Sequence, residues 1–206
     1  MRRQEFLIED RAEVRALLSR ARYASLATVD PEGAPEVRPM NYAVVGEHLY
    51  FHTAPGGSLA ARVGSLCAVT VVDLAVWIPS TWRHRFMACP ATTYYASLVV
   101  RGQLLEVGQL EEKARVLEAF MTRYQPEAGH LALTDPRYHG PLRALTVLKV
   151  SLERSSLKFK FGQHVSAEQR QVIHQRLLAR QGPGDEQCAA WMRRLALVCP
   201  EPGRHE

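Results

Sequence analysis

The sequence predicts an α+β protein that is mainly β, and three observations support this fold class. Six segments carry the β-branched, aromatic or alternating apolar residues of strands, at residues 23–29, 37–42, 49–53, 67–72, 93–107 and 144–152. Turn residues separate the first three, because Pro31 and Gly33 follow the first segment and Gly46 follows the second. Apolar residues at helical spacing lie outside these segments. We therefore expect the first three segments to form an antiparallel meander, with residues 67–72 as the next strand.

Three helices are expected before and among the strands. Asp10 is a capping residue, and the helix after it has apolar residues at helical spacing, namely Val14, Leu17, Leu18 and Ala21. Ser58 is expected to cap a short helix at residues 59–63. A third helix ends before Pro126, and its apolar positions are Leu110, Ala114, Leu117, Met121 and Tyr124. Residues 73–91 and 127–143 are expected to be irregular.

Two further helices are expected at the C-terminal end. Ser166 begins a capping box, and the helix after it has the apolar residues Val172, Ile173, Leu177 and Leu178. Asp185 is expected to cap the last helix, whose apolar side consists of Cys188, Trp191, Met192, Leu195 and Val198. The two helices would form a hairpin whose apolar stripe must be covered. The expected division is one domain at residues 1–162 and a helical hairpin at residues 163–206.

Composition excludes several classes of protein. A chain of 206 residues, 47% hydrophobic and 23% charged, is long enough for one packed domain with an appendage. No apolar run is near the roughly 20 residues of a membrane helix, and the first residues lack a secretory core, so a cytoplasmic protein without membrane contact is expected. The formal charge of +5 comes from scattered arginines, which makes nucleic acid an unlikely partner. Reduced thiols and no metal site are expected for the well-separated Cys67, Cys89, Cys188 and Cys199.

Polar residues of the strands point to an anionic ligand. Arg38 lies in an otherwise apolar strand, where a guanidinium needs an anionic partner. Asn41 on the same strand, His52 and Thr53 on the next, and Ser58 at the expected helix start could converge on one ligand. The sequence therefore predicts a phosphate-binding site. The alternative is that Arg38 occupies an exposed position of an alternating strand.

Residues 73–91 are aromatic and basic, and two interpretations of them remain open. Trp77, Trp82 and Phe86 alternate with arginines and could line a pocket for a flat ring, through stacking and cation–π contact. Alternatively, the segment is a loop that packs Trp77 and Phe86 onto the strands and leaves its arginines in water.

Four stretches, residues 23–29, 38–41, 50–53 and 89–102, resemble a known family in their order and spacing. They are similar to the pyridoxamine 5′-phosphate oxidase-like flavoproteins, in the branch that contains nitroimidazole reductases. The likeness covers roughly residues 10–160. It implies a six-stranded antiparallel split β-barrel that forms a homodimer and binds FMN in clefts between the subunits. Residues 158–164 also resemble the lysine-rich strand end of FMN-binding repressor-like relatives, which implies an approach to the partner subunit's cofactor phosphate.

The resemblance also implies roles for single residues. A histidine at the position of His52 would lie near flavin and substrate and could donate a proton; the alternative is a hydrogen-bonded histidine without a chemical role. Ser58 stands where relatives carry a basic residue, so that another cation would have to compensate. The expected cofactor-binding set is Arg38, Pro39, Met40, Asn41, Phe51, His52, Thr53, Ser58, Arg62, Lys158 and Lys160.

The expected function is that of an FMN-dependent oxidoreductase. It would take electrons from a nicotinamide cofactor, NAD(P)H, and pass them to a small aromatic or nitro-bearing substrate. A flavin-binding transcriptional regulator is one alternative, and it would need a basic face made by Arg170, Arg176, Arg180, Arg193 and Arg194. A haem-binding protein is the other, and it would need His164 or His205 as an iron ligand.

Overall fold

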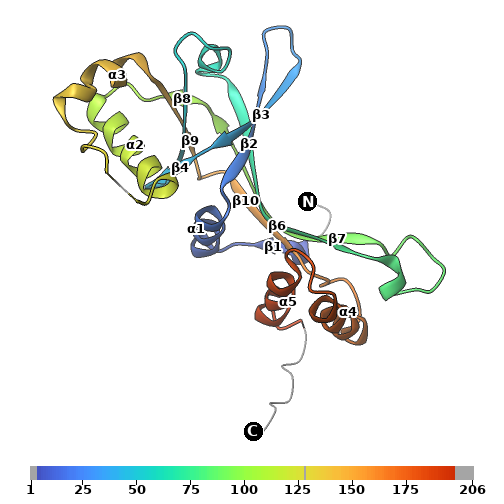
Figure 1. Cartoon of the computed structure of the whole chain (residues 1–206). Coiled ribbons are helices and arrows are strands. Elements are labelled where there is room, and N and C mark those ends of the chain that lie inside the picture. Colours follow the sequence, from blue (N-terminus) through green and yellow to red (C-terminus); the bar gives the residue numbers. More distant parts are fainter. Residues whose placement is uncertain (1–3, 128, 198–206) are drawn as a thin grey trace. The chain divides into compact units, whose positions relative to one another are not determined.

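The computed structural model describes residues 4–127 and 129–197 (Figure 1). Within them, one sheet has six strands in the order β1-β10-β7-β6-β2-β3, and a second has four in the order β4-β5-β9-β8. The strands are β1 (Leu7–Ile8), β2 (Tyr23–Val29), β3 (Pro35–Asn41), β4 (Ala43–Val45), β5 (His48–Thr53), β6 (Leu66–Ile78), β7 (Thr92–Gln103), β8 (Leu105–Glu106), β9 (Thr146–Ser151) and β10 (Ser155–Lys160). The α+β class with antiparallel sheets is confirmed; the described residues form ten strands in two sheets, where six strands were expected.

The helix expected at residues 59–63 is not formed. Five α-helices lie in the described residues, four of them at expected places and one in addition. They are α1 (Arg11–Arg20), α2 (Leu110–Tyr124), α3 (His139–Ala144), α4 (Ala167–Arg180) and α5 (Asp185–Arg194). Helix α3 lies in the segment that was expected to be irregular, and it displaces the start of the last long strand from residue 144 to Thr146. In the described part of the chain, every helix is too short or too polar to span a bilayer.

The chain divides into two compact units. One contains Met1–Leu17, Val72–Ser97 and Leu157–Glu206, and the other contains Leu18–Val71 and Leu98–Ser156. The C-terminal helices therefore group with a central segment of the chain. The predicted domain boundary after residue 162 stays a prediction.

The expected meander is wrong because the chain changes sheet at Tyr42. Strands β2 and β3 pair in the six-stranded sheet, with Leu26 opposite Arg38, whereas β4 pairs with β5 in the other sheet. Tyr42 is fully buried; its hydroxyl lies 2.8 Å from the carbonyl of Leu18, and its amide donates to the hydroxyl of Tyr124 at 3.0 Å. These bonds stand in place of ladder bonds and let the chain pass from one sheet to the next. The turn expected at Gly46 does form, with φ of 59° there.

Strand β6 is longer than expected. The sequence predicts its end at residue 72, but Leu74, Val76 and Ile78 continue the alternation and are all buried. Asp73 is half-buried, and as an isolated acid it does not end the strand. Residues 73–78 are therefore strand, and only residues 79–91 form the connection to β7, with a short 3₁₀ turn at Ser80–Trp82.

The C-terminal hairpin of α4 and α5 buries most of its apolar stripe, but Val172 is 39% exposed. The ring centroid of Trp191 on α5 lies 4.6 Å from that of Phe159 and 5.9 Å from that of Phe161. Phe159 lies near the end of β10, and Phe161 directly follows that strand. Ser166 caps α4 by accepting from the amide of Gln169 at 3.3 Å. The cap expected from Asp185 is wrong, since Gly184 is the cap residue of α5 and Asp185 is its first helical residue. Val198 and Cys199 lie outside the described residues.

Candidate functional site

Strand β3 carries different residues on its two faces. The register places Glu36 opposite Thr28 and Arg38 opposite Leu26, so Glu36 and Arg38 share one face. Pro35, Val37 and Pro39 lie on the other face and are exposed. Strand β3 was expected to be apolar apart from Arg38, and this is true only of the face that carries Pro35, Val37 and Pro39.

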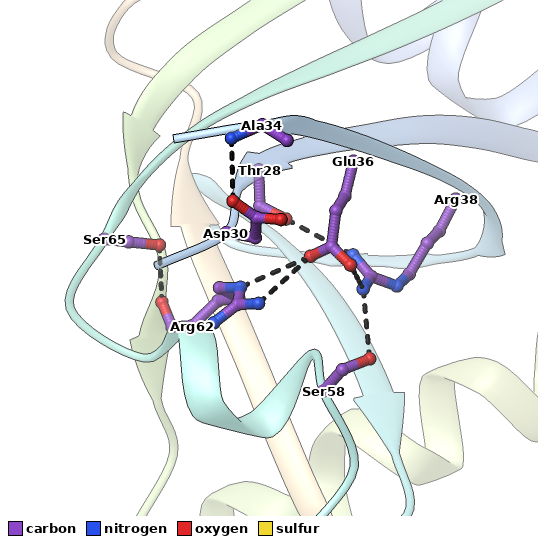
Figure 2. A network of polar contacts seen from close by, with 8 residues as sticks. All are labelled: Thr28, Asp30, Ala34, Glu36, Arg38, Ser58, Arg62 and Ser65. Atoms are coloured by element: carbon purple, nitrogen blue, oxygen red, sulfur yellow. Dashed lines mark hydrogen bonds and ion pairs between the residues drawn. The ribbon is translucent and has the colours of Figure 1, made fainter. Parts of the chain in front are cut away.

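Arg38 is the centre of a network of polar contacts (Figure 2). Its guanidinium lies 2.8 Å from the carboxylate of Glu36, donates to the hydroxyl of Ser58 at 3.0 Å, and donates to that of Thr28 at 3.3 Å. Arg62 donates from two nitrogens to the other oxygen of Glu36, each at 3.3 Å. Five side chains from β2, β3 and the segment after β5 thus meet at one place.

The network has more positive than negative charge. Arg38 and Arg62 are two cations, and Glu36 is the only carboxylate that pairs with them among the described residues. The hydrogen bond from Arg38 holds the pKa of Glu36 below its usual value, so the carboxylate is ionised at neutral pH. One positive charge therefore remains, at side chains that are 12 to 30% exposed.

The helix expected after Ser58 does not form. The chain makes a 3₁₀ turn at Ala60–Arg62, with Leu59 as the residue before it and no side-chain cap. Such a turn is too short to present the dipole of a helix. Ser58 contributes its exposed hydroxyl to Arg38 instead, and Arg62 is brought to the network by the same turn.

The other expected residues of β3 and β5 lie apart from this network. Met40 and Asn41 are half-buried at the end of β3, and Thr53 is half-buried at the end of β5. Pro39 is exposed on the opposite face of β3. Phe51 is fully buried, so its ring is part of the core, and the expected cofactor contact of this residue stays a prediction.

His52 is half-buried against helix α2. Its ring packs edge-on against that of Phe120, with centroids 5.0 Å apart and planes at 79°. Burial lowers the pKa of His52, so the imidazole is neutral at neutral pH. Both interpretations of His52, as a proton donor or as a histidine without a chemical role, stay predictions.

Lys158 and Lys160 belong to the other compact unit. Both lie on β10 and approach the ring of Tyr95, at 5.4 and 5.9 Å from its centroid. Lys160 also donates to the hydroxyl of Thr92 at 2.5 Å. Their role toward a cofactor stays a prediction.

The aromatic and basic segment does not pack as the second interpretation proposed. Trp77 is 57% exposed on β6, and Phe86 is 81% exposed in the connection to β7. Neither ring is an anchor for this chain. Trp82 differs, since its ring stacks with the guanidinium of Arg180, 4.6 Å from the ring centroid.

Most of the arginines that would form the basic face of a regulator contact other groups of the same chain. Arg170 donates to backbone carbonyls, Arg180 pairs with Asp185, Arg193 contacts His174 and Arg194 pairs with Glu13. Four of the five candidate arginines thus have polar partners within the chain. His164, the described candidate for iron, packs edge-on against Phe6 at 5.6 Å, and His205 lies outside the described residues. No group of three metal-binding side chains gathers within residues 4–127 and 129–197.

Comparison with known proteins identifies the family. A family model described as pyridoxamine 5′-phosphate oxidase matches residues 10–159. The chain belongs to the pyridoxamine 5′-phosphate oxidase family. This confirms the resemblance found in the sequence. No curated protein sequence matches the chain.

Solved structures share the fold of this pyridoxamine 5′-phosphate oxidase family member. A candidate 5-nitroimidazole antibiotic resistance protein from Bacteroides thetaiotaomicron is 23% identical, with a TM-score of 0.57 over 74% of this chain and 85% of that one. An FAD and haem binding protein from Mycobacterium smegmatis is 24% identical, with a TM-score of 0.64 over 85% and 80%. The flavocytochrome Anf3 from Azotobacter vinelandii is 21% identical, with a TM-score of 0.68 over 82% and 76%. These identities establish the fold alone.

The network at Arg38 fits the phosphate of the cofactor that the family implies. Two guanidiniums and two hydroxyls are the donors that bind phosphate oxygens in proteins. The carboxylate of Glu36 already occupies these donors as an anion. Sequence reasoning missed Glu36 and Thr28, although an acid two residues before Arg38 on a strand must share its face.

Proposed function

We propose that the chain is a flavin-binding oxidoreductase that holds the phosphate of FMN at Arg38, Arg62 and Ser58. The observation that carries this proposal is the surplus positive charge of that network, where two half-buried guanidiniums share one carboxylate. Family membership supports it, as do the similar structures of an FAD and haem binding protein and a flavocytochrome. A riboflavin phosphate group is common to FMN and FAD, so the network suits either nucleotide.

The protein's part in the reaction is to orient the cofactor and supply a proton site. Bound flavin provides a ring that takes up two electrons, here from a nicotinamide donor, and passes them to a substrate. Arg38 and Arg62 fix the phosphate end of the nucleotide. His52, neutral at neutral pH, accepts or returns a proton beside the substrate. A small nitro-bearing aromatic is the proposed substrate class, which the similar nitroimidazole resistance protein supports.

A homodimer is the proposed assembly, and the outer side of β2, β3 and β6 supports it. We call this side the uncharged sheet face; it consists of Tyr23, Ser25, Ala27, Val29, Pro35, Val37, Pro39, Leu66, Ala68 and Thr70. It carries no charged residue, although Tyr23, Val37 and Leu66 are 66, 64 and 76% exposed. An apolar surface of this extent is typical of a contact with another protein. In such a dimer, Lys158 and Lys160 are proposed to face the partner subunit's cofactor.

Flavin binding is tested by the spectrum of the purified protein and by titration. We expect flavin absorption bands, or their appearance after FMN is added and free FMN removed. Arg38→Ala should weaken FMN binding roughly 10- to 100-fold, because charged hydrogen bonds to the phosphate are lost, and should change riboflavin binding little. Arg143→Ala, which removes an exposed arginine of α3, is the matched control. Equal losses for FMN and riboflavin would remove the role of Arg38, and a Soret band without flavin would replace the proposal with haem binding.

A further inference from the structure

Glu36 binds both cations of the proposed phosphate site at once. One of its oxygens lies 2.8 Å from Arg38 and the other lies 3.3 Å from two nitrogens of Arg62. A carboxylate and a phosphate bind a guanidinium in the same way, because each places two acceptor oxygens opposite the paired N–H donors. Glu36 therefore occupies the donors that a phosphate would need (Figure 2).

An incoming phosphate and the carboxylate cannot share these donors at low cost. Both are anions, and two negative charges within a few ångströms repel each other unless one leaves. The backbone of Glu36 is fixed in β3, two residues from Arg38 and on the same face. Its side chain is 30% exposed, so a change of rotamer would turn the carboxylate toward water without moving the strand.

We propose that Glu36 is an internal competitor for the anion site, so that flavin phosphate binds by displacing its carboxylate from Arg38 and Arg62. This inference rests on the proposed function and adds a residue that sets the affinity of the same site. Glu36 keeps two half-buried cations paired whenever no nucleotide is bound, which preserves the fold around β3. The affinity for the nucleotide is lower than two arginines alone would give.

Displacement also means that only strong anions gain from binding at this site. A ligand must offer more than the single charge of a carboxylate to gain from the exchange. A phosphate monoester carries up to two charges and three acceptor oxygens, whereas a ligand without phosphate gains nothing at this place. Glu36 therefore narrows the difference in affinity between phosphorylated flavin and riboflavin, because only the phosphorylated ligand has to displace it.

The test compares Glu36→Gln with a variant that removes an equal charge elsewhere. Glu153→Gln, in the exposed turn between β9 and β10, is that control. FMN, riboflavin and inorganic phosphate are titrated into each folded protein at fixed ionic strength. We expect Glu36→Gln to bind FMN and phosphate about tenfold more tightly than the wild type, with riboflavin affinity unchanged, and Glu153→Gln to match the wild type. Glu36→Ala should change affinity in the same direction.

A double variant isolates the mechanism. In the Arg38→Gln background, Glu36→Gln should lose most of its effect, because the two side chains act on one contact. FMN binding by Glu36→Gln that is equal to or weaker than that of the wild type would overturn the inference while leaving flavin binding intact; Glu36 would then only orient the guanidiniums. If no variant binds FMN, the proposed function fails, and tighter phosphate binding by Glu36→Gln would still support the competition.

Discussion

The guanidinium of Arg180 donates to both carboxylate oxygens of Asp185, at 2.7 and 2.5 Å, across the turn that joins α4 to α5. Asp185 is only 1% exposed, and it also accepts from the amide of Gly182 at 2.8 Å. Arg180 in turn donates to the carbonyl of Trp77 on β6 at 3.0 Å. One buried acid thus fixes the hairpin turn and, through its partner, ties that turn to a strand.

Asp185→Asn should destabilise the protein by about 2–3 kcal/mol. The variant keeps the size of the side chain but loses the bidentate charged pair, and it leaves a buried amide beside a guanidinium. Urea unfolding followed by circular dichroism measures the change. Glu186→Gln, one residue later and exposed, should shift the free energy of unfolding by less than about 0.5 kcal/mol. Similar values for the two variants would show that the pair contributes nothing beyond removal of a charge.

The same pair predicts how stability depends on pH. Hydrogen bonding from Arg180 holds the pKa of Asp185 below its usual 3.8 in the folded protein. A carboxyl whose pKa is lowered by folding stabilises the folded state above the unfolded pKa, and that contribution disappears as pH falls through the folded pKa. The difference in unfolding free energy between wild type and Asp185→Asn should therefore be constant above about pH 5 and shrink below it. A difference that does not change down to about pH 2 would contradict the lowered pKa.

Gly162→Ala should be strongly destabilising, by about 3 kcal/mol. Gly162 has φ of 95°, and a Cβ there would meet the hydroxyl of Tyr94 and lie 3.0 Å from its Cζ. Backbone strain and overpacking each cost on the order of 1–3 kcal/mol, and the ring of Tyr94 is fully buried and cannot move aside. Gly140→Ala, in helix α3 with nothing near its would-be Cβ, should be neutral or slightly stabilising. Thermal unfolding of the two variants checks the contrast.

Local patterns explain which elements were predictable. Strand β2 has the expected bounds because its alternation covers its whole length, and Val14, Leu17, Leu18 and Ala21 of the first helix region are all buried at their helical spacing. The change of sheet at Tyr42 could not be predicted, because it depends on Leu18 and Tyr124, which are distant in sequence. Helix α3 was missed since its six residues include Gly140 and Pro141.

In the candidate site, too, some contacts could be predicted from the sequence and others could not. Arg38 was expected to need an anion, and the need is real, but the anion seen is Glu36 on its own strand. Spacing of two along a strand is visible in the sequence and would have found this pair. The contact of Thr28 with Arg38 could not be predicted from the sequence, because it depends on the register of β2 against β3. Ser58 does not cap a helix as expected, because the following segment forms only a 3₁₀ turn, and its hydroxyl accepts from Arg38 instead.

Val37→Lys should convert the proposed dimer to a monomer. Val37 is 64% exposed within the uncharged sheet face, where a buried ammonium without a partner would cost several kcal/mol in an interface. Sedimentation of the wild type and the variant measures the change. Leu131→Lys, at a position that is 47% exposed in the connection after α2, is the control and should leave the dimer intact. A monomeric wild type, or a Val37→Lys variant that stays dimeric, would exclude this face as the interface.

His52 should titrate with a midpoint below its usual 6.5, because burial beside Phe120 disfavours the charged ring. Nuclear magnetic resonance of the imidazole resonances against pH gives the midpoint directly. Phe120→Ala opens the ring to water and should move the midpoint back toward 6.5, whereas Leu131→Ala, at an exposed position, should not move it. If Phe120→Ala leaves the midpoint unchanged, contact with that ring is not the cause of the shift. A midpoint above about 7 would instead leave the imidazole mostly charged at neutral pH, which would make His52 a proton donor from the start and contradict the neutral side chain proposed here.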